Sequence, residues 1–272
     1  MLAKEIISKD NEKIKFLRKL GQKKYRNKEG MFFIENLKII HDGLESKFYP
    51  ESLFITEDFL NKNKKQVNNI LLKSGLEYYY LINEAVNKSF SALDTPSGIC
   101  AIYKKQERKI KFSAPIVYLN AINDPGNLGT ILRSALAFGF RNIILDEGCA
   151  DLYAPKVINS AKDAILKLDI ELDKKFVLLK KIKKEMKVFS TRLDGGEKID
   201  RLNKEKVFCL VLGSESHGIS KEVEKLSDNF IKIDMSHDIE SLNVAISAGI
   251  IFHNYYINSW QLAYTRIQYN IK

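Results

Sequence analysis

Cysteine, tryptophan and proline are scarce in this chain of 272 residues, which contains three Cys, one Trp and five Pro. The cysteines are odd in number, far apart and set in apolar runs, which excludes a disulfide framework and predicts reduced core thiols at Cys100, Cys149 and Cys209. The four histidines show no ligand-type spacing with one another or with the cysteines, so no metal site is predicted.

Long apolar runs are also missing. No stretch reaches the roughly 18 to 20 uncharged apolar residues that a membrane-spanning helix needs, and the opening MLAKEIISKDNEK is too polar for a signal peptide. We therefore expect a cytoplasmic protein that has no membrane partner.

The composition is that of a folded protein, with 45% hydrophobic and 10% aromatic residues. Lys and Arg total 44 against 34 acidic residues, and the net charge of +10 favours a polyanion as partner. The charge is uneven, because residues 1–112 carry 22 basic and 14 acidic side chains whereas 113–272 carry 22 and 20.

The basic charge is densest in residues 9–28, where nine Lys or Arg accompany two acidic residues. Ile14, Leu17 and Leu20 recur at helical spacing, which predicts a helix with one packed face and one basic face. That basic face is either an ordinary solvated surface or an RNA contact.

Two series of apolar runs divide the chain. The first predicts strands at 31–35, 52–56, 76–80 and 98–103, with helical or polar stretches between them. The second predicts strands at 116–120, 142–146, 187–191, 207–213 and 230–234, separated by helical segments and followed by a long helix from Ser241. The pattern predicts a small α/β domain at 1–111 and a domain with a parallel sheet at 112–272.

The first loop of functional interest is NDPGNLGT, which follows the strand at 116–120 and enters a helix at about Leu128. Asn127 is placed to cap that helix and Arg133 to lie about one turn inside it, near a helix N-terminus that favours an anion. The dinucleotide pattern GxGxxG is absent, and a cap and a surface ion pair would also explain these two residues.

The second loop, GSESHGIS, runs from Gly213 to Ser220 after an apolar strand. It has two glycines but no Lys-Ser/Thr after the second, which excludes a Walker A motif. Glu215 stands where a GxSxG hydrolase has its serine, which excludes that nucleophile. We interpret His217 as a loop histidine.

The third loop follows the strand at 230–234 and ends in Ser241-Leu242-Asn243, where an apolar helix opens. Ser241 has the residue type of an N-cap. Taken singly, each loop leaves the function open.

Together, in this order and spacing, the three loops resemble the motifs of the SpoU (TrmH-like) branch of the SPOUT methyltransferases. The matching stretches are NLGTILR at 127–133, LGSESHGIS at 212–220, and IDM at 233–235 followed by SLN at 241–243. The first half looks like the family's L30e-like RNA-binding domain, so the resemblance spans nearly the whole chain.

The resemblance implies an S-adenosylmethionine-dependent RNA 2'-O-ribose methyltransferase that works as a homodimer on structured RNA, without a metal. It favours 23S-type rRNA, with tRNA as the alternative substrate. The implied fold is α/β, with a C-terminal SPOUT α/β-knot (a trefoil-knotted parallel sheet) after the small L30e-like domain.

The resemblance also assigns roles to residues. Those implied for catalysis and for organising the polar side of the site are Asn127, Arg133, Glu215, Ser241 and Asn243. Those implied for cofactor binding are Gly213, Ile233, Met235 and Leu242. Arg133 would reach toward the partner subunit's cofactor.

One segment departs from the family pattern. Where the related branch often has Lys-Val-Val-Arg-Ala-Ser-x-Gly-Ala, this chain has KVINSAKDA, which puts Asn159, Ala161 and Asp163 at the Arg, Ser and Gly positions. An RNA-facing arginine is missing, and this leaves open which RNA is recognised. It also leaves open a catalytically weak RNA-binding or ribosome-assembly factor that keeps the knot.

Overall fold

The computed structural model describes residues 2–214, 217–236 and 238–269, with side chains described as far as residue 258. None of the helices in these ranges is long and apolar enough to cross a membrane.

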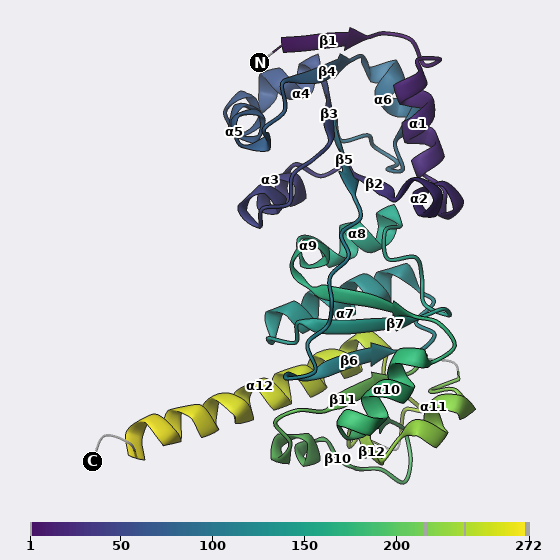
Figure 1. Cartoon of the computed structure of the whole chain (residues 1–272), viewed down its shortest axis with the longest axis vertical. Helices are drawn as coiled ribbons and strands as arrows, with labels where there is room; N and C mark the ends of the chain where they lie inside the picture. The colour runs from purple at the N-terminus through teal and green to yellow at the C-terminus, as the bar shows by residue number, and fades with distance from the viewer. Residues whose placement is uncertain (1, 215–216, 237, 270–272) are drawn as a thin grey trace. The chain divides into compact units, whose positions relative to one another are not determined.

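The chain forms two compact units (Figure 1). The first consists of Met1–Gln106 together with Tyr153–Leu166, and the second of Glu107–Leu152 together with Lys167–Lys272. The second unit thus contains all three sequence loops of functional interest. The division of the chain into domains at 1–111 and 112–272 stays a prediction.

The first unit has a five-stranded mixed sheet in the order β1-β4-β3-β5-β2. Its strands are β1 (Leu2–Ile6), β2 (Met31–Ile34), β3 (Ser52–Thr56), β4 (Tyr78–Ile82) and β5 (Ile99–Lys104). β4 is parallel to both of its neighbours, and β5 is antiparallel to both of its own. The four expected strands are present, and β1 is added at the edge because its run LAKEI pairs with β4.

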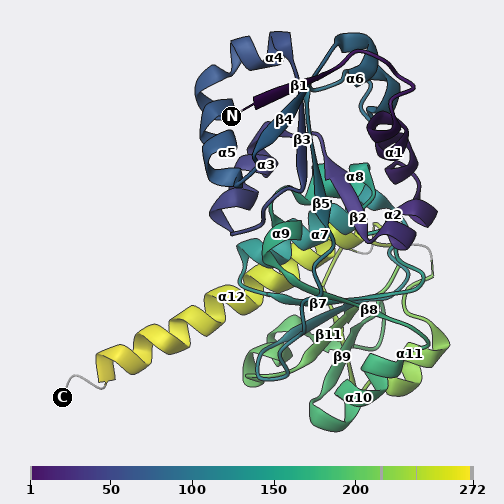
Figure 2. The same cartoon turned by 45° about the horizontal axis from the view of Figure 1, so that its top comes forward.

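Helices cover both faces of this sheet (Figure 2). They are α1 (Glu12–Leu20), α2 (Lys23–Glu29), α3 (Leu37–Glu45), α4 (Glu57–Lys62), α5 (Lys64–Ser74) and α6 (Glu84–Phe90), and the later segment adds α8 (Pro155–Ala161). Tyr153, just before α8, packs on Phe32 of β2 with ring centroids 4.4 Å apart. This packing attaches a segment from far along the chain to the first unit.

The basic segment 9–28 forms two helices rather than one. α1 begins after Asn11, whose side chain accepts from the Lys13 amide at 2.9 Å, and it ends at Gly21. Ile14, Leu17 and Leu20 are fully buried as their spacing predicts, and each contributes about 1.5 to 3 kcal/mol of hydrophobic stabilisation.

One cation of the basic segment is structural. Arg26 of α2 is only 4% exposed, and its guanidinium donates to the Leu20 carbonyl at 2.8 Å. This bond satisfies a carbonyl at the end of α1, so Arg26 belongs to the packing of the two helices and is not part of the basic surface.

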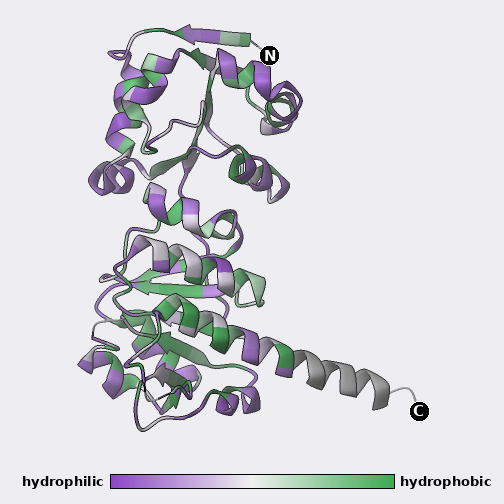
Figure 3. Cartoon of the chain, turned by 180° about the vertical axis from the view of Figure 1, so that it is seen from behind, coloured by the Kyte–Doolittle hydropathy of each residue, from purple (hydrophilic) through white to green (hydrophobic). Residues whose placement is uncertain are grey.

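The second unit has a seven-stranded sheet in the order β10-β12-β9-β11-β6-β7-β8, and every pair of neighbours is parallel. Its strands are β6 (Ile116–Leu119), β7 (Asn142–Asp146), β8 (Asp169–Asp173), β9 (Val188–Thr191), β10 (Glu197–Lys198), β11 (Cys209–Leu212) and β12 (Asn229–Lys232). The expected parallel sheet is confirmed, and the strands are coloured mainly as hydrophobic (Figure 3).

Helices lie on both faces of the parallel sheet, with α7 and α12 on one side and α10 and α11 on the other (Figures 1 and 2). Their bounds, with that of a short 3-10 helix, are α7 (Pro125–Ala137), α10 (Val177–Glu185), η1 (Ile199–Lys204), α11 (Lys221–Leu226) and α12 (Val244–Tyr269). The short helix α9 (Ala164–Lys167) lies where the chain passes from the first unit back to the second. Because the strands are parallel, their carboxyl ends lie at one edge of the sheet, where ligands bind in such folds.

The sequence did not predict strand β8, whose residues DIELD are mostly charged. The acids are used locally: Glu171 accepts from the Ile110 amide at 2.8 Å. Asp173 is 1% exposed and accepts from the Leu178 and Leu179 amides and the Tyr118 hydroxyl at 2.9, 3.0 and 3.1 Å. Asp173 therefore caps α10 from the end of an edge strand.

Candidate active site

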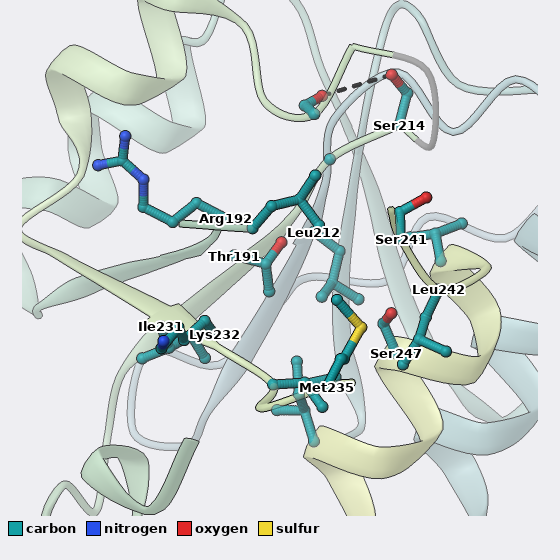
Figure 4. A pocket seen from close by; sticks show the side chains of 16 residues that line it. Thr191, Arg192, Leu212, Ser214, Ile231, Lys232, Met235, Ser241, Leu242 and Ser247 are labelled. Carbon is teal, nitrogen blue, oxygen red and sulfur yellow. Dashed lines mark hydrogen bonds between the residues drawn. The ribbon is translucent and has the colours of Figure 1, made fainter. Parts of the chain in front are cut away.

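A pocket opens beyond the carboxyl ends of β9, β11 and β12, next to the start of α12 (Figure 4). It encloses about 750 Å³, a volume that includes its opening to solvent. Its walls come from four segments of the second unit, namely Thr191, Arg192 and Leu193; Leu212, Gly213, Ser214 and Gly218; Ile231, Lys232, Ile233 and Met235; and Ser241, Leu242, Val244, Ser247 and Ile251. Cofactors and other small ligands bind at this edge of a parallel sheet in such folds.

All four residues predicted to hold the cofactor line this pocket. They are Gly213, Ile233, Met235 and Leu242, and Ser241 lines it with them. The Met235 thioether points toward Leu212 and Ser247 (Figure 4). The structure thus brings residues of the second and third motifs around one cavity, and their role in binding stays a prediction.

The loop between Gly213 and Gly218 depends on both glycines. A Cβ on Gly213 would lie 2.3 Å from the Gly218 carbonyl carbon and 2.5 Å from its oxygen, closer than backbone atoms allow. Gly218 has φ +63°, in the left-handed region that favours glycine. Ser214 and Gly218 exchange two backbone hydrogen bonds of 2.9 Å, which close the loop on itself.

Asn127 and Asn243 form a second cluster, outside the lining of the pocket. The Asn243 side-chain nitrogen donates to the Asn127 side-chain oxygen at 3.0 Å. The Asn243 oxygen accepts from the Ala245 and Ile246 amides at 2.9 and 3.3 Å. These bonds fix which way the Asn243 amide points.

Two predicted helix caps were wrong. The cap of α7 is Asp124, whose side chain accepts from the Asn127 amide at 2.8 Å, because the helix begins at Pro125 and already includes Asn127. α12 begins at Val244, so Asn243 caps it and Ser241 lies before the cap, on the pocket wall. Both asparagines thus lie at the starts of helices.

The other two predicted catalytic residues lie apart from the pocket lining or beyond what is described. Arg133 is exposed on α7, about two turns from its start, and its guanidinium makes no hydrogen bond or ion pair with any described residue. Glu215 lies outside the described residues. The roles of both stay predictions.

Sequence reasoning missed Asn120 and Asp146, which tie the functional loops to the sheet. Asn120 is 2% exposed, and its side chain donates to Asp146 at 2.5 Å and accepts from the Ser220 amide at 2.7 Å. A signal was present in the sequence, because each apolar run, IVYLN and NIILD, ends in one polar residue at the carboxyl edge of the sheet.

A small network of charges lies beside the pocket. Asp234 pairs with Lys198 at 3.2 Å and with Lys232 at 3.7 Å. The hydrogen bond and charge of Lys198 hold the pKa of Asp234 below its ordinary value. Lys232, which lines the pocket, therefore faces a neighbouring negative charge.

The segment that departs from the family pattern lies at the end of α8. Asn159 is half-buried, Ala161 is fully buried, and Lys162 after it has φ +56° and ψ −138°. This backbone conformation is strained for a lysine, and it marks a tight turn that Ala161 and Asp163 flank with short side chains.

The described residues contain no cluster of His, Cys, Asp or Glu that could hold a metal ion. All three cysteines are buried and unpaired, and burial raises the pKa of each thiol. The predicted core positions of the three thiols are confirmed, and their reduced state stays a prediction.

Comparison with known proteins identifies the family. Residues 114–253 match the SpoU rRNA Methylase family, and residues 11–101 match the MRM3-like substrate binding domain. The first match spans more than half of the chain, so the chain belongs to the SpoU rRNA methylase family.

Similar proteins agree with this assignment. The 23S rRNA (guanosine(2553)-2'-O)-methyltransferase RlmP of Bacillus subtilis is 28% identical over 252 residues, which cover 92% of this chain and 98% of that protein. The AdoMet-bound rRNA methyltransferase from Sinorhizobium meliloti superposes with a TM-score of 0.81 at 25% identity, covering 93% of this chain and 97% of that one. A solved RNA 2'-O ribose methyltransferase gives a TM-score of 0.78 at 25% identity, covering 94% and 100%. The predicted family, the enzyme class and the S-adenosylmethionine cofactor are confirmed.

Proposed function

We propose that this chain methylates the ribose 2'-oxygen of one nucleotide in 23S-type rRNA, as a cytoplasmic homodimer. The observation that supports it is the convergence of the motifs: residues of the second and third line one pocket, and Asn243 of the third is hydrogen-bonded to Asn127 of the first. The Bacillus subtilis relative is named as a methyltransferase of 23S rRNA, which favours that substrate over tRNA.

The pocket suits S-adenosylmethionine. Gly213 lines it without a side chain, at a position where the Gly218 backbone leaves no space for a Cβ, and Ile233, Met235 and Leu242 supply apolar contacts. Hydroxyl groups of Ser214 and Ser241 add polar partners near the loop. Bound there, the cofactor supplies a methyl group on a positively charged sulfur.

The chain's own residues would position the ribose and handle its proton. Transfer requires the 2'-oxygen in line with the methyl group, and holding reactants in line accounts for much of the rate in such reactions. We assign Asn127 to orienting the ribose, with its own amide oriented by Asn243 at 3.0 Å.

Arg133 has a different task in this proposal. A guanidinium keeps its charge in proteins and is a poor proton acceptor. Arg133 therefore binds the adjacent phosphate and stabilises the negative charge that develops on the oxygen, while Glu215 or water receives the proton. Exposure on α7 leaves Arg133 available to RNA or to a partner subunit.

The first unit would bind the RNA substrate. It contains the match to the MRM3-like substrate binding domain and most of the excess positive charge of the chain. Lys23, Lys24 and Lys28 are exposed on α2 and make no ion pair with a described residue. These three cations are available to phosphates.

The test is incubation with labelled S-adenosylmethionine and separated 23S rRNA, 16S rRNA and tRNA, followed by digestion to nucleosides and mass spectrometry. A 2'-O-methylnucleoside in 23S rRNA alone is the expected result, and one confined to tRNA would refute the substrate. Cofactor binding without transfer to any RNA would indicate an RNA-binding or assembly factor. Light scattering that gives a monomer would contradict the homodimer.

A further inference from the structure

Asn120 holds both ends of the loop that forms one wall of the pocket. Its backbone amide donates to the Leu212 carbonyl at 2.9 Å, where the loop leaves β11. Its side-chain oxygen accepts from the Ser220 amide at 2.7 Å, where the loop meets α11. The separation of the two ends is thus set by one residue that belongs to neither end.

The same side chain is anchored on its other side by Asp146. The Asn120 side-chain nitrogen donates to one Asp146 oxygen at 2.5 Å, and the second oxygen accepts from the Ala121 and Gly148 amides at 3.0 Å each. Ala121 is held at φ +57°, a conformation that is strained for a non-glycine residue. Asp146 therefore fixes the direction in which the chain leaves β6 toward Asp124 and Asn127.

The polarity of this network is determined at every bond. The Ser220 amide is a donor, so Asn120 must present its oxygen there and its nitrogen to Asp146. The Ala121 and Gly148 amides are donors too, so residue 146 must present acceptors to them. With both carboxyl groups ionised, an amide facing a carboxylate satisfies all of these bonds in either order, whereas two carboxylates or two amides do not.

We propose that Asn120 is a positioning residue for methyl transfer. It holds the loop from Gly213 to Ser220 and the loop leading to Asn127 in a fixed position relative to each other. The proposal rests on the proposed function of the pocket. Gly213, Ser214 and Gly218 line the pocket from the loop that Asn120 closes, and Asn127 lies seven residues beyond Asn120 on the other loop. A change in the hydrogen bonds of Asn120 would shift the two loops relative to each other, and catalysis is sensitive to shifts of that kind.

The test exchanges the two side chains. Asn120→Asp alone sets two carboxylates against each other, and Asp146→Asn alone sets two amide nitrogens against each other. The double variant Asn120→Asp/Asp146→Asn restores every bond with the polarity of one bond reversed. In it, the amide introduced at position 146 can donate to the carboxylate introduced at position 120, while the amide oxygen accepts from Ala121 and Gly148.

Calorimetry with S-adenosylmethionine measures the effect without any RNA. We expect each single variant to weaken binding by about tenfold or more and the double variant to recover to within about threefold of the wild type. In single-turnover assays with substrate RNA, the single variants should also lower the rate at saturating cofactor, since Asn127 is displaced as well. A double variant no better than the single ones would overturn the proposal.

A matched control separates positioning from stability. Asp173 is also a buried carboxylate at the carboxyl end of a strand in the same sheet, but it caps α10 and contacts neither loop. The variant Asp173→Asn therefore weakens a comparable network away from the pocket. It should lower the melting temperature as Asn120→Asp does and leave cofactor affinity within about twofold. If Asp173→Asn loses as much cofactor affinity as Asn120→Asp at the same loss of stability, the role of Asn120 is purely structural. If the wild type binds cofactor but methylates no RNA, the proposed function is refuted. The comparison of cofactor affinities among the variants still tests whether Asn120 positions the loop.

Discussion

The side-chain nitrogen of Asn243 donates to the side-chain oxygen of Asn127 at 3.0 Å, although 116 positions separate the two residues. Asn127 lies in the first turn of α7 and Asn243 caps α12, so the bond joins two helix N-termini. Both ends carry partial positive charge, which favours a phosphate or a developing oxyanion nearby. The bond therefore links the first and third motifs at a point suited to negative charge.

Asn243→Asp tests this link. The introduced carboxylate would still accept from the Ala245 and Ile246 amides and cap α12, but it cannot donate to Asn127. We expect the melting temperature to stay within about 2 °C and turnover to fall about tenfold, because Asn127 loses its orientation. Asn83→Asp, which keeps the cap of α6 through the Val86 amide, is the control and should leave turnover unchanged.

Arg133→Ala should abolish turnover and spare cofactor binding. The side chain is exposed and does not line the pocket, so its removal should leave the affinity for S-adenosylmethionine within about twofold. Turnover should drop by about a hundredfold or more, the effect of removing a group that stabilises developing charge. Arg141→Ala, also exposed, is the control. Near-normal turnover in Arg133→Ala would remove that residue from the mechanism.

Gly213→Ala should destroy cofactor binding. The new methyl group would collide with the Gly218 backbone, so the loop must open and the pocket wall must move. Calorimetry should detect no S-adenosylmethionine binding at concentrations that saturate the wild type. Gly249→Ala is the control, because nothing lies within 4 Å of its added methyl group and alanine favours a helix by about 1 kcal/mol. Unchanged binding in Gly213→Ala would contradict the pocket as the cofactor site.

Lys23→Gln/Lys24→Gln should weaken RNA binding in a salt-dependent way. Removing one interaction between a cation and a phosphate should reduce the slope of log K against log salt by about 0.7 to 0.9, so the pair should reduce it by about 1.5. Lys64→Gln/Lys65→Gln removes the same charge from the start of α5, where both lysines are exposed, and serves as the matched control. Filter binding between about 50 and 200 mM salt gives both slopes, and equal reductions in the two pairs would indicate general charge attraction alone.

Glu35 should make the protein less stable as pH rises. Burial raises the pKa of its carboxyl above the ordinary 4.5, despite hydrogen bonds from Ser91 and Ala92. A carboxyl with a raised folded-state pKa stabilises fully below its unfolded-state pKa, and that stability is lost as pH rises through the folded-state value. Glu35→Gln stays neutral, so it should gain about 1 kcal/mol over the wild type at about pH 8 and little below about pH 4.5.

Urea unfolding followed by circular dichroism at both pH values checks the Glu35 prediction. Glu29→Gln, at an exposed position on α2, should show no such difference. A gain of equal size at both pH values would mean that packing of the amide, rather than ionisation, accounts for it.

The sequence predicts the main architecture where one physical signal dominates. Apolar runs such as IVYL and NIIL are recognisable as buried strands, and the spacing of Ile14, Leu17 and Leu20 correctly indicates the buried face of α1. It fails at the edges of the sheets. β1 contains Lys4 and Glu5, and three of the five residues of β8 are acidic. Both segments form strands by pairing, β1 with β4 and β8 with β7.

The site shows the same division. Gly213, Ile233, Met235 and Leu242 were identified from motif resemblance and lie around one pocket, because a motif keeps residues that contact a ligand. Asn120, Asp146 and Ser220 act through contacts 26 and 100 positions apart, which no local pattern contains. The helix caps were assigned one turn or less away from their true positions, because Asp124 and Asn243 compete with neighbours of equal capping ability.

The parallel arrangement of the second sheet also determines when, during synthesis of the chain, the cofactor pocket can form. Each strand pair requires a crossover, so contacts distant in sequence must close before the pocket exists, and such topologies fold slowly. The pocket wall includes Val244, Ser247 and Ile251 of α12. A chain still attached to the ribosome after the last strand, β12, therefore contains its whole first unit and every strand of the parallel sheet, yet no closed cofactor site. The cofactor site can close only after the residues of α12 that line it have been made.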